Sequence, residues 1–411
     1  MSTSFWHPQA MMSTVKNNEI VIDRGEGSYL WTEDGTKLLD ATAALWYANI
    51  GHGRPEIATA VAKQMQKLEH YQTFDKYATR PTLELCDRIV DLAPFDDGAK
   101  VLLGSGGSDA IETAAKLARR YFTATGRPDK RIIISRQQAY HGLHGHGTSL
   151  GWLPANREGY GELDPAVLRA SATDWHDVEK TIMNTGPELI AAFFCEPVIG
   201  TGGVIFPGAE YLAEVRELCR KHDILFVSDE VITGFGRTGK WFASERFDLQ
   251  PDMMTFAKGV TSGYLPLGGL VVAPHVAEPF FADEGSLSFR HGVTYSGHAA
   301  VCAAALANID VLERENLVQR VASLETVLAD ALAPLAELDG VIDVRAGVGL
   351  LGAVELRDAQ LANKVEAHGL GHGVLLRKIV GGNVIQISPP FIITEDEIQL
   401  IADTIAAALG E

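Results

Sequence analysis

The chain has 411 residues, of which 46% are hydrophobic, and a formal net charge of −18 at pH 7. This length and hydrophobic content favour one large domain with a smaller one beside it. The negative charge disfavours a surface for nucleic acid or for an anionic membrane, because both need clustered Lys and Arg. We therefore expect small-molecule partners, with no nucleic acid and no membrane.

The cysteines are far apart and form no CxxC pair, which is typical of reduced thiols and predicts a cytoplasmic protein. Residues 1–10 lack the basic and apolar parts of a signal peptide, and no apolar run of about 18 residues follows. Neither export nor membrane insertion is predicted. The four cysteines are Cys86, Cys195, Cys219 and Cys302.

In chain order, the first signals are Tyr29-Leu30-Trp31 and an Asp34-Gly35 turn, in an N-terminal segment that we expect to pack with the C-terminal part. From residue 99 to residue 273, short β-branched runs alternate with amphipathic helical stretches such as 109–122. This alternation predicts an α/β fold with a mainly parallel sheet. The predicted strands are 100–103, 131–135, 190–194, 224–228, 253–256 and 270–272.

The last part of the chain indicates a smaller α+β unit. Residues 295–298 are typical of a turn, and the Ala-rich helix predicted after them connects the large domain to this unit. Short strands are predicted at 341–345, 350–355 and 384–387. We therefore expect residues 51–296 to form the large domain, and residues 1–50 and 297–411 to form a discontinuous small domain.

Glycines and polar residues follow the predicted strands, at the edge where open α/β sheets bind ligands. The turn at 104–108 offers free N–H groups for a phosphate. The turn does not match GxGxxG, because Asp109 replaces the third glycine, and it lacks the GK[ST] of a P-loop. Taken alone, the turn is better explained by a helix N-cap at Ser108. The other strand-end residues are 140–142, 196–197, 229–231 and 258–259.

Asp229 ends a hydrophobic run, where an ionised carboxylate needs a cation. A protonated pyridine nitrogen is such a cation, and it makes pyridoxal 5'-phosphate (PLP) an electron sink. A structural ion pair or a helix cap is the more common explanation of a single Asp. Lys258 follows Met-Met-Thr-Phe-Ala, so desolvation is expected to favour the neutral amine that forms a Schiff base over an ordinary surface charge.

Tyr140 has a flat ring to place beside a cofactor, although a loop aromatic packed on the surface is an alternative. The nearby His141, His144 and His146 have no carboxylate at ligand spacing. A metal site is therefore less well supported than ordinary loop structure, and we expect no metal.

Two stretches carry a resemblance to a known family: Ser228-Asp-Glu-Val-Ile-Thr-Gly-Phe-Gly-Arg-Thr-Gly239 and Thr255-Phe-Ala-Lys-Gly259. In this order they resemble the class III aminotransferases of the type I PLP-dependent transferase fold, and more narrowly the amine:pyruvate, or omega-transaminase, branch. The similarity runs from Trp6-His7-Pro8 to Ser388-Pro389-Pro390.

The resemblance implies roles for the strand-end residues. Lys258 holds PLP as a Schiff base and is catalytic, Asp229 pairs with the pyridine nitrogen, and Val231 and Tyr140 lie on the two faces of the ring. The family usually has Ser-Gly-Ser at the phosphate turn, so Gly106 removes one hydroxyl donor. Glu196 matches an acidic residue near Asp229, with a plain loop carboxylate as the alternative. The implied cofactor-binding residues are Gly106, Gly107, Ser108, Tyr140, His141, Glu196, Asp229, Val231, Lys258 and Thr294.

The resemblance also implies partners. Thr294 matches a threonine that reaches the phosphate in the neighbouring subunit, which implies a homodimer, possible also as a dimer of dimers, with shared active sites. Arg377 matches a mobile arginine that binds a substrate carboxylate. Leu45, Trp46 and Phe74 match positions that line the amine pocket, together with Tyr140. Ordinary core packing is an alternative for each of the three, and it explains Leu45 and Phe74 equally well.

The implied activity is transfer of an amino group from a primary amine or omega-amino compound to a keto acid. Thr201 stands where glutamate-using members have a glutamate, so we expect pyruvate rather than 2-oxoglutarate. An aminomutase or a decarboxylase would share the cofactor residues. A non-catalytic binding protein is disfavoured because Lys258, Asp229 and Tyr140 occur together.

Overall fold

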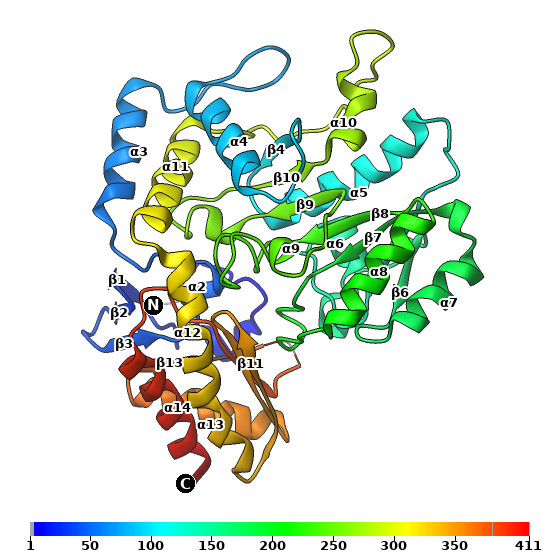
Figure 1. Cartoon of the computed structure of the whole chain (residues 1–411). Helices are drawn as coiled ribbons and strands as arrows, with labels where there is room; N and C mark the ends of the chain where they lie inside the picture. Colours follow the sequence, from blue (N-terminus) through cyan, green and yellow to red (C-terminus); the bar gives the residue numbers. More distant parts are fainter. Residues whose placement is uncertain (1–3, 380, 411) are drawn as a thin grey trace.

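The computed structural model describes residues 4–379 and 381–410 (Figure 1). Residues 1–3, 380 and 411 of the predicted small domain lie outside this range. The largest sheet has seven strands in the order β4-β10-β9-β8-β7-β5-β6. Its strands are β4 Lys100–Gly104, β5 Ile132–Arg136, β6 Val167–Ala170, β7 Ile190–Cys195, β8 Leu225–Asp229, β9 Met253–Phe256 and β10 Gly268–Val272.

The expected α/β fold is confirmed, because β6, β5, β7, β8 and β9 pair in parallel along the sheet. The strand β10, the last of the seven in chain order, lies between β9 and β4 and runs antiparallel to both. The sequence prediction missed β6. This edge strand pairs only with β5 and contains the exposed Arg169, so it lacks the apolar run that marks the central strands.

Helices cover both faces of the sheet, so the side chains on both faces of the central strands are buried and the strands are continuous apolar runs. All six residues of β7 are buried, and its two phenylalanines point to opposite faces. Phe194 packs with residues of α5 Gly107–Ala124, whereas Phe193 packs with residues of α7 Trp175–Thr185 and α8 Ala209–Lys221. The predicted helix at 109–122 is thus the central part of α5.

The other strands of the described residues form two four-stranded sheets. In the first, β3 pairs in parallel with β13, so residues from the two ends of the chain share a sheet. The limits of the predicted domains remain predictions. The first sheet has the order β1 Ile22–Glu26, β2 Tyr29–Thr32, β3 Lys37–Asp40, β13 Val374–Leu375, and the second β11 Val341–Val348, β12 Leu351–Leu356, β15 Val384–Ile387, β14 Arg377–Lys378.

The Ala-rich stretch forms α11 Ala299–Arg314, which lies along α3 Pro55–Lys67 and α4 Arg80–Leu92 (Figure 1). The next helix, α12 Leu317–Leu332, packs on β11, so the two consecutive helices connect the large sheet to the second unit. The remaining long helices are α13 Ala359–Gly371 and α14 Glu395–Gly410. The short elements are α1 Met12–Val15, α2 Ala43–Trp46, α6 Gly145–Leu150, α9 Ala243–Arg246, α10 Pro274–Phe281, η1 Pro154–Asn156, η2 Pro187–Leu189, η3 Lys258–Val260 and η4 Ala333–Glu337.

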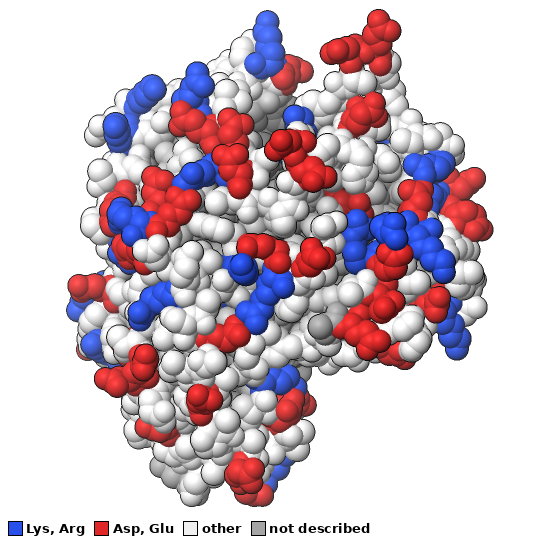
Figure 2. Space-filling model, viewed as in Figure 1, with Lys and Arg blue, Asp and Glu red and all other residues white. Residues whose placement is uncertain are grey.

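The surface shows no segregation of charge on the face in Figure 2. Lys and Arg side chains lie interspersed with Asp and Glu side chains across it (Figure 2). Among the described helices, none combines the length and the apolar character that a membrane crossing requires.

Candidate active site

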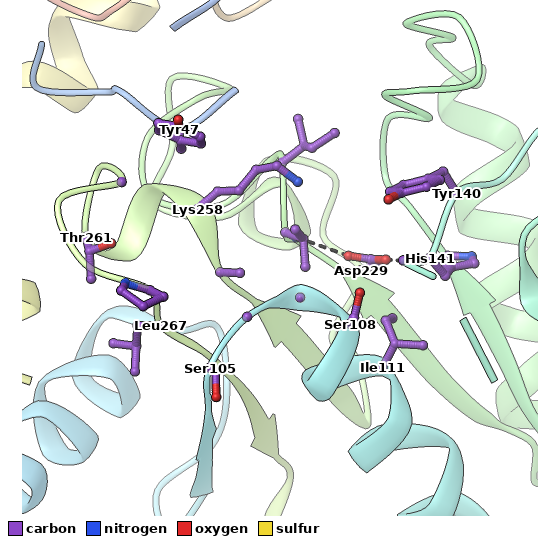
Figure 3. Close-up of a pocket in the computed structure, with 18 of the residues that line it drawn as sticks. Tyr47, Ser105, Ser108, Ile111, Tyr140, His141, Asp229, Lys258, Thr261 and Leu267 are labelled. Atoms are coloured by element: carbon purple, nitrogen blue, oxygen red, sulfur yellow. Dashed lines mark hydrogen bonds and ion pairs between the residues drawn. The ribbon is translucent and has the colours of Figure 1, made fainter. Parts of the chain in front are cut away.

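A cavity of about 410 Å³ lies at the carboxyl ends of the central strands and at the start of α5 (Figure 3). Loops that follow β5, β7, β8 and β9 meet here, as expected for an open α/β sheet. The predicted site residues in its lining are Gly106, Gly107, Ser108, Tyr140, His141, Glu196, Asp229, Val231 and Lys258.

Lys258 begins η3, two residues after β9 ends. Its φ of 45° is in the left-handed region, which costs a non-glycine residue roughly 1 kcal/mol or more and marks a position held by its surroundings. Desolvation lowers the pKa of the amine to about 8, although the charges of Asp229 and Glu196 act in the opposite direction. At neutral pH the amine is therefore close to the point at which it releases its proton.

Asp229, the last residue of β8, is almost fully buried, and its carboxylate takes part in three hydrogen bonds. Its Oδ2 lies 2.7 Å from Nδ1 of His141, and its Oδ1 accepts hydrogen bonds of 3.1 Å from Thr255 Oγ1 and from the Val231 N–H. The His141 ring is itself buried, edge-on to Phe194 with ring centroids 6.0 Å apart. These contacts fix the Asp229 carboxylate at the cavity wall (Figure 3).

Glu196 follows β7 and binds two loops through its carboxylate. Oε1 accepts a hydrogen bond from the Tyr140 N–H, and Oε2 accepts one from the Gly200 N–H, both at 3.0 Å. Burial raises the pKa of Glu196, whereas His141 and the two N–H donors lower it. Glu196 thus organises the loop that carries Tyr140 rather than being an unattached loop carboxylate.

The glycine turn lets α5 start directly below the cavity. A Cβ on Gly107 would lie 3.0 Å from both methyl groups of Val231, so a larger residue would separate the helix from the loop after β8. The N-cap is Gly106 and has no side-chain cap, so the alternative of an N-cap at Ser108 is wrong. The first N–H groups of α5 remain available to an anion at this place.

The structure places other predicted residues away from the cavity lining. Leu45 is 44% exposed and Phe74 48% exposed, which also contradicts their alternative assignment to a core. Thr294 is exposed as well. Trp46 is buried in a cluster with Val198, Ile232 and others, so it packs behind the loops of the site.

Arg377 lies in β14 and donates a hydrogen bond of 3.3 Å to Gln386 Oε1. Desolvation lowers its pKa, and its charge acts on both Lys258 and Tyr140. Arg377 is therefore near the site, although it is not part of the cavity lining.

Tyr47, Thr261 and Tyr264 line the cavity but escaped the sequence prediction. A Cβ on Gly263 would lie 2.2 Å from the Tyr47 ring, so the glycine at 263 makes this close approach possible. The glycines after Lys258 were a visible signal of close packing, but nothing in the sequence indicates which distant aromatic residue packs there.

The predicted loop histidines have structural partners. Nδ1 of His146 lies 2.7 Å from Glu112 Oε2, and Nδ1 of His144 lies 3.6 Å from Asp109 Oδ1, so tertiary structure supplies carboxylates that sequence spacing did not show. Within the described residues, no group of three or more His, Cys, Asp or Glu side chains is arranged to hold a metal ion.

Comparison with known proteins identifies the family. Residues 10–409 match the family model for class III aminotransferases. The chain is 37% identical to the putrescine–pyruvate aminotransferase of Pseudomonas aeruginosa, covering 92% of this chain and 88% of that protein. It is 35% identical to the chloroplastic gamma aminobutyrate transaminase 3 of Solanum lycopersicum, covering 96% and 80%.

Solved structures agree in fold and in sequence. An (S)-enantioselective omega-transaminase from Thermomicrobium roseum is 38% identical with a TM-score of 0.94, covering 98% of this chain and 95% of that one. An amine transaminase from an uncultivated Pseudomonas species, solved in its PLP-bound form, is 36% identical with a TM-score of 0.94, covering 100% and 99%. The chain therefore belongs to the class III aminotransferases, and it is a PLP-dependent transaminase of the type I fold.

Proposed function

We propose that this transaminase moves an amino group from a primary amine or omega-amino compound to pyruvate in two ping-pong half-reactions, with PLP joined to Lys258 as a Schiff base. The observation that carries the proposal is the meeting of three groups in one cavity. These are a desolvated lysine amine, a buried carboxylate and the open N-terminus of a long helix.

The residues of the cavity fit PLP. The backbone N–H groups of Gly106, Gly107 and Ser108, at the start of α5, suit its phosphate, because a helix N-terminus binds anions. The carboxylate of Asp229, held by His141 and Thr255, suits a protonated ring nitrogen. Bound there, PLP supplies an electron sink for the electrons left when a proton leaves the carbon of the amine.

Lys258 is proposed to move the proton. A group whose pKa is near the working pH both accepts and returns a proton efficiently, and the pKa of Lys258 is about 8. The charges of Asp229 and Glu196 keep this pKa from falling further. Tyr140 is also proposed to contact the ring and the substrate, since it faces the same space as Asp229 and Lys258 (Figure 3).

The choice of acceptor depends on Thr201 and Arg377. Thr201 is buried beside the loop of Glu196 and has no charge with which to pair an arginine, so Arg377 stays available to a substrate carboxylate. One relative bears pyruvate in its name, whereas others are named for gamma aminobutyrate, so the relatives support several amine donors.

We further propose a homodimer with shared active sites, possible also as a dimer of dimers. Thr294 is exposed in this chain, and large apolar side chains are exposed in the same part of the molecule, around a second cavity. Burial of such side chains is the usual driving force of subunit association. The exposed residues are Tyr71, Phe74, Tyr77 and Tyr295. The cytoplasmic location remains a prediction from the cysteines.

The acceptor is tested with the purified holoenzyme, a panel of donors and two keto acids. The donors are putrescine, gamma aminobutyrate, β-alanine and an arylalkyl amine, and each is paired with pyruvate or with 2-oxoglutarate. Formation of alanine at a higher kcat/KM than formation of glutamate is the expected result. A preference for 2-oxoglutarate would contradict the proposal for pyruvate while leaving the transaminase assignment intact.

A further inference from the structure

Arg136, the last residue of β5, is a fully buried cation without a direct counter-ion. None of the ion pairs found between described residues involves its guanidinium, and its Nε has no hydrogen-bond acceptor. Burying a charge in this way is costly unless the surroundings offset it. The residue therefore requires an explanation beyond core packing.

The guanidinium connects the segments that follow the two strands on either side of β5. Nη1 donates to the Ala172 carbonyl at 3.4 Å, just after β6, and Nη2 donates to the Glu196 carbonyl, just after β7. The ring of Tyr211 lies 5.5 Å from the guanidinium carbon. Arginine suits this place because its planar fork reaches two acceptors at once.

The two ends of the segment 136–140 both bind Glu196. At its start, the side chain of Arg136 donates to the carbonyl of Glu196. At its end, the N–H of Tyr140 donates to the carboxylate of Glu196 at 3.0 Å. The turn between them is tightly packed, because a Cβ on Gly202 would lie 2.0 Å from the Gln138 carbonyl oxygen. Movement of Glu196 would therefore move Tyr140.

Electrostatics links the same residues. Burial alone lowers the pKa of Arg136, but Cys195, Tyr211 and Glu196 beside it raise the pKa above its usual value, so the guanidinium remains charged. Burial raises the pKa of Glu196, and the charge of Asp229 adds to this effect. A permanent cation behind Glu196 opposes that effect and favours the ionised carboxylate that accepts the Tyr140 N–H.

We propose that Arg136 is a positioning residue that sets Tyr140 in the cofactor cavity by fixing both the main chain and the charge of Glu196. This inference rests on the proposed contact of Tyr140 with the cofactor. It assigns to a residue outside the cavity lining a measurable effect on cofactor binding.

A double-mutant cycle on PLP binding tests the inference. PLP is titrated into apoenzyme, followed by absorbance, for wild type, Arg136→Met, Tyr140→Ala and the double variant. We expect each single change to raise the PLP dissociation constant about tenfold, and the double variant to bind no more weakly than the weaker single variant, as for residues acting through one path. Arg136→Lys, which keeps the charge and loses the fork, is expected to be intermediate.

Arg320 provides a matched control, because its guanidinium also binds two backbone carbonyls, those of Phe391 and Ile393, but on α12. Arg320→Met is expected to lower thermal stability and leave the PLP dissociation constant unchanged.

Independent, multiplicative effects of Arg136→Met and Tyr140→Ala on the PLP dissociation constant would overturn the inference and leave the proposed role of Tyr140 intact. An Arg136 variant that loses only stability would do the same. An unchanged dissociation constant in Tyr140→Ala would overturn the inference together with the proposed role of Tyr140. Should Arg136→Met not fold, Arg136→Lys combined with Tyr140→Ala gives the same test.

Discussion

The residues predicted to hold the cofactor and those predicted to line the amine pocket differ in how completely one chain surrounds them. On the side of the strand ends, Asp229, His141 and Glu196 are buried, and each is hydrogen-bonded to a neighbour that fixes it. By contrast, Leu45 and Phe74, predicted for the amine pocket, are about half exposed and lie outside the cavity lining. A single chain thus builds the part proposed for the cofactor, whereas Leu45 and Phe74 remain exposed to solvent in the single chain.

The largest expected effect is on the part proposed for the cofactor. Lys258→Ala is expected to lower kcat by about 10⁴-fold or more, the upper range for loss of a general acid/base, while PLP still binds through its phosphate and ring contacts. Single-turnover kinetics and a PLP titration measure the two effects separately. Lys240→Ala, which removes an exposed lysine paired with Glu245 at 3.2 Å, is the control and is expected to leave kcat unchanged. Substantial transamination by the Lys258 variant would contradict its assignment.

The desolvation of Lys258 also predicts a pH-dependent stability of the apoenzyme. In the folded chain its pKa is about 8 instead of 10.5, so below pH 8 the folded state carries an unfavourable buried charge. Between about pH 8 and pH 10.5 the unfolded chain binds more protons than the folded one, so wild-type stability gains with rising pH. Apo Lys258→Met is therefore expected to be more stable than the apo wild type at pH 7, by up to about 3 kcal/mol.

Urea unfolding of both apoproteins from pH 7 to pH 10.5 measures this difference. The advantage of Lys258→Met is expected to shrink steadily across the upper part of that range. A constant difference would show that Lys258 is not desolvated in the apoenzyme and that the gain comes from packing alone.

Arg377→Ala tests the part proposed for the substrate. Loss of a charged hydrogen bond costs about 1.5 to 3 kcal/mol, so kcat/KM for pyruvate is expected to fall by roughly one to two orders of magnitude. An arylalkyl amine brings no carboxylate, so its half-reaction is expected to suffer less. Stopped-flow spectra of the two half-reactions provide the measurement. The neighbouring Lys378, bound to Glu366 at 3.0 Å, gives the control variant Lys378→Ala. Equal losses in both half-reactions would show that Arg377 has another role.

The smallest expected effect concerns the second subunit. Thr294→Ala removes one hydroxyl, so PLP dissociation is expected to become about fivefold faster, corresponding to about 1 kcal/mol. Dialysis of the holoenzyme followed by absorbance measures retention of PLP, and sedimentation measures the oligomeric state. Thr123→Ala, at an exposed threonine of α5, is the control. A fully active monomer would contradict the shared site, whatever the effect of the threonine.

The cofactor side was more predictable than the substrate side for a physical reason. The strand ends follow apolar runs that the sequence shows clearly, and key residues come directly after them, as Asp229 follows Leu-Phe-Val-Ser and Lys258 follows Met-Met-Thr-Phe-Ala. The edge strand β6 has no such run and was missed. Tyr47 was missed as well, because its place at the cavity depends on a contact with Gly263, more than two hundred residues away.

The sequence by itself indicated the α/β fold, the positions of the central strands along the chain and the family, because hydrophobic periodicity and local motifs act over short distances. Only the tertiary structure decided the partners of buried charges. His141 beside Asp229, Glu196 under the loop of Tyr140 and Arg136 behind Glu196 join segments that are distant in sequence. These pairings follow from the way strands associate in the sheet, and no local pattern encodes them.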